Sequence, residues 1–436
     1  MTPAEGGPRR RVLIVSFYFP PAGGGGVQRV LKLCKHLPEM GWDVDVLAPD
    51  DPRWVAVDPG LAAEIPPGTI VHRAPYRGPS QERAPEERLR RARGAGRLAT
   101  RAAILGRKLL VPDPSVPWVP SAARAGRRIV RERAIDVVLT TSPPMSAHLV
   151  GSAIARRAGV PWVADFRDSW LANPHRRYER RSVRAKRQLL ERIARRALRR
   201  ASGISAVTEV IAEEARELAP AGTPIRVISN GCDFDDFAGL RHEPGERLRL
   251  LHAGYFFGAR TPRPFLQALA RLLERRPELR GTVEARFIGG FREADRAWAE
   301  GLGLGEALVV DGFVPHEGAL RAMKEADALL LLIPNAGGLG TTVLSGKLFE
   351  YLAAERPVLA LVPPEGAAAA ILRETELAWI ADPDDLEAIE ETLEQVYDAW
   401  RDGSLGAERI LPHDLRERLD RRARAAELGS LMEEVR

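Results

Sequence analysis

A lysine and a glutamate stand one helical turn apart behind a glycine-rich segment in the second half of the chain. Lys347 and Glu350 are three residues apart, so a helix would place both on one face. Lys347 would lie in the first helical turn, where the helix dipole disfavours a cation unless an anion is nearby. The preceding run, residues 334–345, offers glycines and hydroxyl groups after an apolar strand. The pattern favours an anion site over a plain intrahelical Lys–Glu pair, which is the alternative.

A second cation stands at the end of another predicted strand in this half. Arg260 follows Gly254, which ends the predicted strand, and precedes the helix predicted over residues 263–275. A guanidinium can bind an oxyanion through two hydrogen bonds, which makes Arg260 a candidate phosphate clamp.

Four consecutive glycines mark the first strand-to-helix turn of the chain. Gly23–Gly26 lie in the run FYFPPAGGGGVQRVLKL, just before a predicted helix. Glycine lets the backbone approach a ligand closely, and a helix N-terminus favours an anion. The run does not match the GxGxxG dinucleotide fingerprint. A flexible turn without a ligand is the alternative.

Two further motifs follow predicted strands in the first half, at the ends where open α/β sheets bind ligands. The run TTSPPMSAHLVG carries His148, for which a structural role is the alternative. The run ADFRDSW carries Asp165, Arg167 and Asp168. These charges suggest a site that faces an acceptor substrate, and an internal Arg–Asp pair that holds the loop is the alternative.

Short β-branched runs alternate with helical patterns throughout, which predicts parallel α/β sheets. In the first half we predict strands at 12–17, 43–48, 70–74, 136–140, 162–166, 203–207 and 226–229, and helices at 27–38, 146–158 and 209–219. In the second half we predict strands at 248–254, 283–289, 307–311, 328–332, 357–361 and 378–381, and helices at 263–275, 316–325, 346–354 and 386–400.

Each half therefore predicts its own doubly wound domain. We expect a first domain over residues 1–238 and a second over residues 239–411. The charged helical segment 412–436 follows, and its return to the first domain is one option. The polar stretch 236–247 contains the joint between the halves.

Composition places the chain among globular proteins. It has 436 residues, is 45% hydrophobic and 28% charged, and carries a net charge of +6. The charge is unevenly divided: residues 1–240 contain 40 Lys/Arg and 25 Asp/Glu, whereas residues 241–436 contain 25 and 34. This asymmetry suggests an anionic partner for the first half.

The two cysteines, Cys34 and Cys232, form no CxxC or metal-binding spacing. No signal peptide and no uninterrupted apolar run of about 18 residues is evident. We therefore expect a cytoplasmic protein that uses no metal, which can also sit at the inner face of a membrane.

The basic charge is concentrated in two segments. Residues 176–200 contain 12 Lys/Arg and 2 Glu, and residues 83–108 contain nine and two. Apolar residues recur at helical spacing in residues 176–200, which predicts an amphipathic basic helix that could lie on an anionic membrane. A helix packed on its own domain, with its arginines solvated, is the alternative. Nucleic acid is not expected as a partner, because no helix-turn-helix, zinc or RNA-binding signature accompanies the clusters.

In this order, the motifs resemble those of family 4 glycosyltransferases, which have the GT-B fold. The resemblance covers nearly the whole chain: the first glycine loop, SPP-x-x-x-H, DFRD-x-W, NG-x-D, G-x5-R at residues 254–260, and GKLFEYLAAERPVLA. It implies two Rossmann-like domains facing a central cleft. It also implies transfer of a sugar, with retention of configuration, from a UDP- or GDP-sugar to a glycan, lipid-linked or small-molecule acceptor. No cofactor and no metal would be required.

The resemblance also implies roles for individual residues. Arg260 and Lys347 would hold the donor diphosphate, and Glu350 would bind the ribose hydroxyls. The other donor contacts that it implies are Gly25 and Gly26 from the first loop, Val314 near the base, and Leu344 and Ser345 against the diphosphate or nucleoside.

Two positions depart from the pattern of the family. Many members carry a glutamate eight residues before Glu350, where this chain has Thr342, and many carry an arginine where it has Gly254. Recognition of the sugar would then rely on backbone amides and hydroxyls around Gly340, Thr341 and Thr342.

In the mechanism that the resemblance implies, the leaving diphosphate takes the acceptor proton, and no enzyme nucleophile is needed. His148 and Asp165 would orient the sugar or the acceptor, and Arg167 and Asp168 would face the acceptor. A nucleotide-sugar epimerase of the same fold is one alternative, and a basic nucleic-acid-binding protein is another. A dehydrogenase is disfavoured, because neither half has a clean dinucleotide fingerprint.

Overall fold

The computed structural model describes residues 9–54, 57–81, 100, 106–107, 109–171, 181–256, 258–406 and 411–436. The chain forms two compact units. The first unit comprises Met1–Ser229 and Arg424–Arg436, and the second comprises Asn230–Ala423.

The first unit is built on a seven-stranded parallel sheet in the order β3-β2-β1-β4-β5-β6-β7. Its strands are β1 (Arg10–Ser16), β2 (Trp42–Pro49), β3 (Ile70–Ala74), β4 (Val137–Thr141), β5 (Trp162–Phe166), β6 (Gly203–Ala206) and β7 (Ile225–Val227). The central strands form because their apolar side chains are buried on both faces, as in Val12, Leu13, Ile14 and Val15 of β1.

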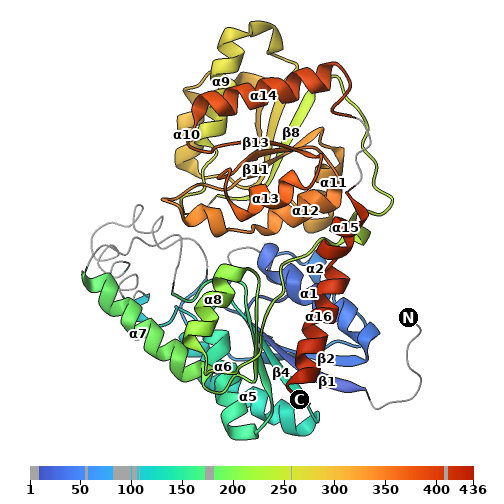
Figure 1. Ribbon diagram of the computed structural model, residues 1–436. Coiled ribbons are helices and arrows are strands. Elements are labelled where there is room, and N and C mark those ends of the chain that lie inside the picture. The colour runs from blue at the N-terminus through green and yellow to red at the C-terminus, as the bar shows by residue number, and fades with distance from the viewer. Residues whose placement is uncertain are drawn as a thin grey trace. The chain divides into compact units, whose positions relative to one another are not determined.

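Helices cover both faces of this sheet. They are α1 (Gly25–His36), α2 (Gly60–Ala63), α5 (Val119–Glu132), α6 (Ser146–Ala158), α7 (Arg181–Leu198), α8 (Glu209–Leu218) and α16 (Arg421–Glu434). Helices α5 to α8 lie on one side of the sheet, and α1 and α16 lie on the other (Figure 1).

The second unit has a six-stranded sheet in the order β10-β9-β8-β11-β12-β13. Its strands are β8 (Leu248–Tyr255), β9 (Val283–Gly290), β10 (Leu308–Val310), β11 (Ala328–Leu332), β12 (Val358–Leu361) and β13 (Ala378–Ala381), all in parallel pairs. Its helices are α9 (Arg263–Arg275), α10 (Glu293–Glu300), α11 (His316–Glu325), α12 (Gly346–Ala354), α13 (Ala367–Arg373), α14 (Leu386–Arg401) and α15 (His413–Leu419). Helices α9, α10 and α14 lie on one side of the sheet, and α11, α12 and α13 lie on the other (Figure 1).

Both sheets have a point where the strand order reverses. In the first unit it lies between β1 and β4, and in the second it lies between β8 and β11. The connections that follow these neighbouring strands leave the sheet towards opposite faces, so a crevice opens at their carboxyl ends. The crevice is where this fold binds ligands.

The predicted strands are confirmed, each with bounds within two residues of those observed, and so is the doubly wound α/β fold class. Helices α2, α5, α10 and α13 were not predicted. Of the two basic segments, most of residues 83–108 and all of residues 176–180 lie outside the described residues.

The C-terminal helices belong to different units. Leu415 and Leu419 of α15 are buried in a core of the second unit, whereas Leu428 and Leu431 of α16 are buried in the core of the first. The chain returns to the first unit within α16, since Ala423 and Arg424 fall in different units.

We predict opposite effects of alanine at two helical glycines of the first unit. A Cβ on Gly151 would lie 2.4 Å from Nε1 of Trp162 and 2.5 Å from Cγ2 of Thr140, both buried, whereas a Cβ on Gly429 would lie 3.5 Å from its nearest neighbour. Gly429→Ala should raise the free energy of unfolding by up to about 1 kcal/mol through helix propensity. Gly151→Ala should lower it by about 1–3 kcal/mol through overpacking.

Urea unfolding followed by circular dichroism measures both effects. A midpoint for Gly151→Ala at or above that of Gly429→Ala would contradict the packing described for α6.

Candidate active site

The loop after β11 is folded tightly before α12 begins. A Cβ on Gly340 would lie 2.1 Å from the Pro334 carbonyl oxygen, so only glycine fits there. Asn335 Oδ1 accepts a hydrogen bond from Gly338 N at 3.0 Å, and Gly338 has a left-handed backbone with φ 88°. The Ser345 side chain then caps α12 by accepting from Lys347 N. The loop therefore delivers the start of α12 to the β8–β11 crevice.

Lys347 and Glu350 form an ion pair on α12. Lys347 Nζ lies 2.7 Å from Glu350 Oε2, and the side chains are 24% and 15% exposed. Burial acts to raise the pKa of Glu350, but the Lys347 ammonium holds that pKa below its usual value. His316 and Arg421 act in the same direction. The Glu350 carboxylate is therefore ionised and faces the Lys347 ammonium.

Gly254 at the end of β8 borders the Lys347 side chain. A Cβ at this position would lie 3.2 Å from Lys347 Cε and 3.5 Å from His252 Nε2. The space beside Gly254 is therefore shared by a lysine stem and a histidine ring. Any larger residue at position 254 would have to displace one of them.

His252 is a polar residue of this crevice that the sequence analysis missed. It is buried, its Nδ1 lies 2.9 Å from the Leu330 carbonyl oxygen, and its ring stacks on Phe256. Because a carbonyl only accepts, Nδ1 carries the proton and Nε2 is an acceptor. Within the described ranges, Nε2 has no hydrogen-bond partner. Burial lowers the pKa of His252 to about 3, although the hydrogen bond to Leu330 opposes the shift, and nearby Arg260 and Lys347 lower it further.

Arg260 is partly buried in the same crevice. Burial lowers its pKa, and the Tyr351 hydroxyl opposes that shift. Its carbonyl oxygen accepts a hydrogen bond from Arg292 at 3.0 Å, which fixes the backbone after β8. Tyr351 accepts a hydrogen bond from Ala253 N at 3.0 Å, which ties α12 to β8.

The other residues predicted to bind the nucleotide-sugar donor lie at the same end of the second unit as the β8–β11 crevice. Val314 and Leu344 are partly buried and pack on a core cluster, and Thr341 donates to the Gly338 carbonyl oxygen at 2.7 Å. Thr342, at the position where many family members have glutamate, is exposed.

In the first unit, Arg167 joins three of the predicted motifs. Its Nε donates to the Ser142 carbonyl oxygen at 2.6 Å, and its Nη1 donates to the Gly26 carbonyl oxygen at 2.9 Å. Its Nη2 is buried and has no hydrogen-bond partner in the described part of the chain. Gly25 begins α1 without a capping side chain, and Asp168 is exposed. The glycine loop, the SPP motif and the DFRD motif therefore meet at one crevice.

Asp165 is buried beneath this crevice. Its carboxylate accepts hydrogen bonds from Arg29, Thr141 and Ser205, with donor distances of 2.8–3.0 Å. Burial acts to raise its pKa, but Arg29 holds the pKa below the usual value. Arg29 also donates to the Ser229 carbonyl oxygen at 3.0 Å. The internal Arg–Asp pair thus exists with Arg29 as the arginine, and these contacts favour a structural role for Asp165.

His148 lies in the first turn of α6, and the ring is fully buried against Phe166, with 4.6 Å between ring centroids. Its Nδ1 lies 2.8 Å from Thr140 Oγ1, which also accepts a hydrogen bond from the Trp162 indole. We therefore assign the Thr140 hydroxyl as the donor and Nδ1 as the acceptor, which leaves the ring proton on Nε2. Nε2 has no partner among the residues described. Burial lowers the pKa of His148 to about 3.

The described ranges contain no cluster of three or more His, Cys, Asp or Glu residues placed to hold a metal ion. They also contain no helix with the length and apolar composition needed to cross a membrane.

Residues 24–231, which hold all the motifs of the first crevice, match the model of the glycosyl transferase 4-like domain family. The chain carries a glycosyl transferase 4-like domain. The resemblance to family 4 glycosyltransferases is therefore confirmed. No curated protein matches the sequence.

Solved structures share the fold of this chain over nearly its whole length. Sucrose-phosphate synthase from Thermosynechococcus elongatus is 17% identical with a TM-score of 0.62, and the match covers 98% of this chain and 99% of that one. The Anabaena protein HepE in complex with UDP-glucose is 15% identical with a TM-score of 0.63, over 97% and 99%. A putative UDP-N-acetylglucosamine 2-epimerase from Listeria monocytogenes is 13% identical with a TM-score of 0.57, over 98% and 96%. At these identities the likeness establishes the GT-B fold.

We predict that buried His148 makes stability pH-dependent. Its pKa is about 3 when folded and about 6.5 when unfolded, so the unfolded state binds more protons between these values. Its stabilising effect is therefore fully present above about pH 6.5. As pH falls below that, the free energy of unfolding should drop by roughly 1.4 kcal/mol per pH unit.

Urea unfolding between about pH 5 and about pH 7 measures this slope. His148→Gln should reduce the slope, whereas His413→Gln, at a side chain that is 86% exposed, should leave it unchanged. Equal slopes in wild type and His148→Gln would refute the assignment of a neutral, buried ring.

Proposed function

We propose that this protein transfers a hexosyl group, with retention of configuration and without a metal, from a nucleotide-diphosphate sugar to an acceptor hydroxyl. The observation that carries the proposal is the group of Lys347, Glu350, Arg260 and His252 at the β8–β11 crevice. Two cations beside a helix N-terminus suit a diphosphate, and an ionised carboxylate beside them suits ribose hydroxyls.

UDP-glucose is the donor with most support. HepE was crystallised with UDP-glucose, with UDP and glucose, and with UDP. GDP-sugars remain within the proposal, because Glu350 would contact only the ribose. In this arrangement Val314 and Leu344 lie against the nucleoside, and Ser345 lies against the diphosphate.

Donor binding would exchange one partner of Lys347 for another. Without ligand, the ammonium is held by Glu350 at 2.7 Å. An incoming diphosphate offers Lys347 a stronger anion, and the released Glu350 carboxylate can then accept hydrogen bonds from two ribose hydroxyls. The ion pair thus keeps both groups charged and in place before the donor arrives.

His252 would act as a positioning residue for Lys347. The Lys347 ammonium has three N–H groups that can donate hydrogen bonds, and the diphosphate does not have to accept all three. The Nε2 acceptor borders the same space beside Gly254 as the lysine stem, so it can take one N–H while the others face the phosphate. The low pKa of His252 keeps the ring an acceptor and avoids a third positive charge in the crevice.

Electrostatic stabilisation would supply most of the rate acceleration. The bond between the sugar C1 and the diphosphate oxygen breaks as Arg260, Lys347 and the α12 amides stabilise the charge left on that oxygen. The bond between C1 and the acceptor oxygen forms on the same face of the sugar, and the acceptor proton passes to the diphosphate. No protein nucleophile takes part.

The first unit would orient the sugar and the acceptor. The Nε2–H of His148 and the Nη2 of Arg167 are donors without a partner among the described residues and suit sugar hydroxyls, and exposed Asp168 suits an acceptor. Gly25 and Gly26 bring α1 amides to the same edge. Asp165 supports this crevice through Arg29 and is not part of our catalytic set.

The domain roles follow from these sites. We assign acceptor binding to residues 1–238 and donor binding to residues 239–411, with 412–436 as the closing helical segment. The acceptor would be a glycan, a lipid-linked sugar or a small molecule in glycan, glycolipid or polysaccharide synthesis. The enzyme would work in the cytoplasm and associate with an anionic membrane through residues 176–200.

A nucleotide-sugar epimerase is the second candidate, supported by the Listeria structure of the same fold. A transferase releases nucleoside diphosphate only as it makes a glycosylated product, whereas an epimerase converts the nucleotide sugar without an acceptor. Chromatography of UDP-glucose incubated with the protein, with and without candidate acceptors, separates the two.

We predict that Lys347→Met and Glu350→Gln each reduce transfer by about a hundredfold or more, because each removes a charge that faces the donor. Glu350→Gln should weaken UDP binding less than Lys347→Met, because an amide still accepts from one ribose hydroxyl. Calorimetry with UDP and with GDP, and the rate of diphosphate release, measure these effects.

The exposed pair Glu317–Arg321 of α11 offers a matched control. Its double alanine variant should retain binding and turnover. Normal turnover in folded Lys347→Met would contradict the assignment of Lys347 to the donor diphosphate.

We predict that substitutions at His252 weaken UDP binding to different extents. His252→Leu should weaken UDP binding several-fold and lower kcat, because Lys347 loses an acceptor. His252→Gln keeps an oxygen acceptor near the same place and should recover much of the loss. Circular dichroism checks that both variants fold, and equal UDP affinity in all three proteins would exclude the positioning role.

A further inference from the structure

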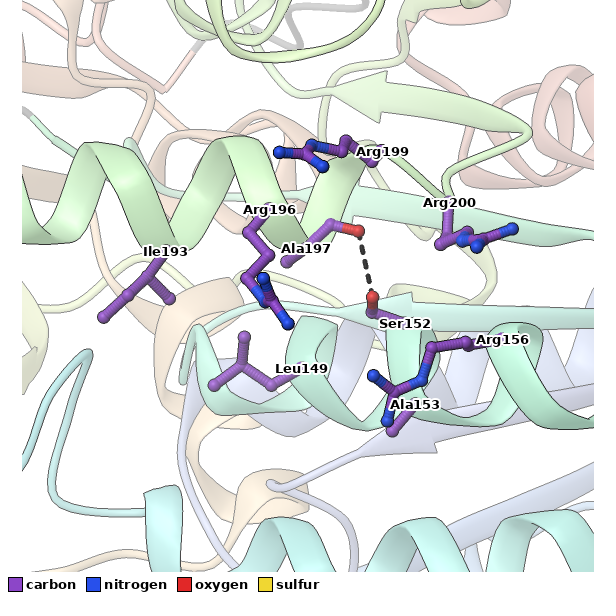
Figure 2. Close-up of a pocket in the computed structure, with 9 residues that line it drawn as sticks. All are labelled: Leu149, Ser152, Ala153, Arg156, Ile193, Arg196, Ala197, Arg199 and Arg200. Carbon is purple, nitrogen blue, oxygen red and sulfur yellow. Dashed lines mark hydrogen bonds between the residues drawn. The ribbon is translucent and has the colours of Figure 1, made fainter.

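A pocket of about 330 Å³ lies between α6 and α7 of the first unit, outside the proposed reaction. Its floor is apolar, formed by Leu149, Ala153, Ile193 and Ala197. Its rim carries four arginines, which are Arg156, Arg196, Arg199 and Arg200 (Figure 2). Ser152 Oγ donates to the Ala197 carbonyl oxygen at 3.0 Å, which joins the two helices across the pocket (Figure 2).

Among the described residues, no acidic side chain pairs with the four rim arginines. All are exposed, and within the described residues none of their guanidinium groups makes an ion pair or a hydrogen bond. Neighbouring Arg195, by contrast, pairs with Glu191 at 2.9 Å. Four like charges around one small pocket repel one another, and a bound anion would relieve that repulsion.

The positive field extends along the neighbouring helices. Burial, followed by the arginines at 157, 124, 131 and 156, lowers the pKa of Arg127 on α5. The pocket also lies beside the C-terminal turns of α6 and α7, whose dipoles stabilise cations. The fold can therefore hold this cluster together without acidic partners.

Most of the pocket lies towards the ends of α6 and α7 that point away from the crevice. Helices α6 and α7 each connect parallel strands, so both run from the carboxyl edge of the sheet towards its amino edge. Most of the pocket comes from their later turns. A ligand there would not compete with groups bound at the carboxyl ends of β1 and β4.

We propose that this pocket binds the phosphate headgroup of an anionic lipid, with the start of the hydrocarbon part on the apolar floor. The inference rests on the proposed membrane association and gives it a specific site. Leu189, which is 44% exposed, lies one turn before Ile193 on the same face of α7 and extends the apolar floor outward. The pocket has no aromatic side chain on which a nucleic-acid base could stack, which favours a lipid over RNA.

Cosedimentation of the full chain with vesicles tests the site. The vesicles contain phosphatidylcholine with or without phosphatidylglycerol, and no sugar donor is present. Removing Arg196, Arg199 and Arg200 as a triple alanine variant should weaken binding to the anionic vesicles by about a hundredfold, given the usual contribution of each basic residue near a membrane. The control variant replaces three exposed arginines of the second unit, Arg271, Arg296 and Arg373, and should bind like the wild type.

Ala153→Leu fills the apolar floor without changing charge and should also weaken binding, which separates a pocket from a diffuse basic surface. Inorganic pyrophosphate at matched ionic strength should compete if the phosphate itself is recognised.

Three results would overturn the site. They are equal losses in the rim and control variants, no effect of Ala153→Leu, and preferential binding of a single-stranded RNA. Absence of all vesicle binding would overturn the lipid site together with the membrane association, and would leave the assignment of sugar transfer untouched.

Discussion

The chemistry of both units depends on one topological constraint. At one pair of neighbouring central strands in each sheet, the chain departs towards opposite faces, and polar side chains can gather there without breaking strand pairing. β1 and β4 bring the glycine loop and the SPP motif together, while β8 and β11 bring together Gly254, Arg260 and the loop that leads to α12. The motifs are far apart in sequence, yet each stands at such an end.

The two crevices differ in how their charged side chains are paired. In the second unit, Lys347 and Glu350 neutralise each other, and His252 stays uncharged between two cations. In the first unit, Arg29 pairs with the buried carboxylate of Asp165, and the His148 and Arg167 nitrogens that lack a partner among the described residues are donors. One unit thus offers exchangeable charges suited to a diphosphate, and the other offers neutral or cationic donors suited to hydroxyl oxygens.

Sequence patterns could predict the strands, because short β-branched runs such as residues 137–141 are buried on both faces and favour extended structure. The Lys347–Glu350 contact could also be predicted, since both residues lie on one helix. The partner of Asp165 could not, because Arg29 is 136 residues away and only the folded sheet brings them together. His252 was overlooked although it interrupts an apolar strand. A polar residue in such a run indicates that its side chain contacts a ligand or forms a buried hydrogen bond.

The shared helix α16 has a consequence for the order of folding. Domains usually fold as they leave the ribosome, with the N-terminal one first. Here Leu428, Leu431 and Met432 complete the core of the first unit but are synthesised after the whole second unit. Leu431 also packs beside Gly203 of β6. Until the second unit has been made, α1 covers this face of the first sheet without α16, so the first unit is completed only at the end of synthesis.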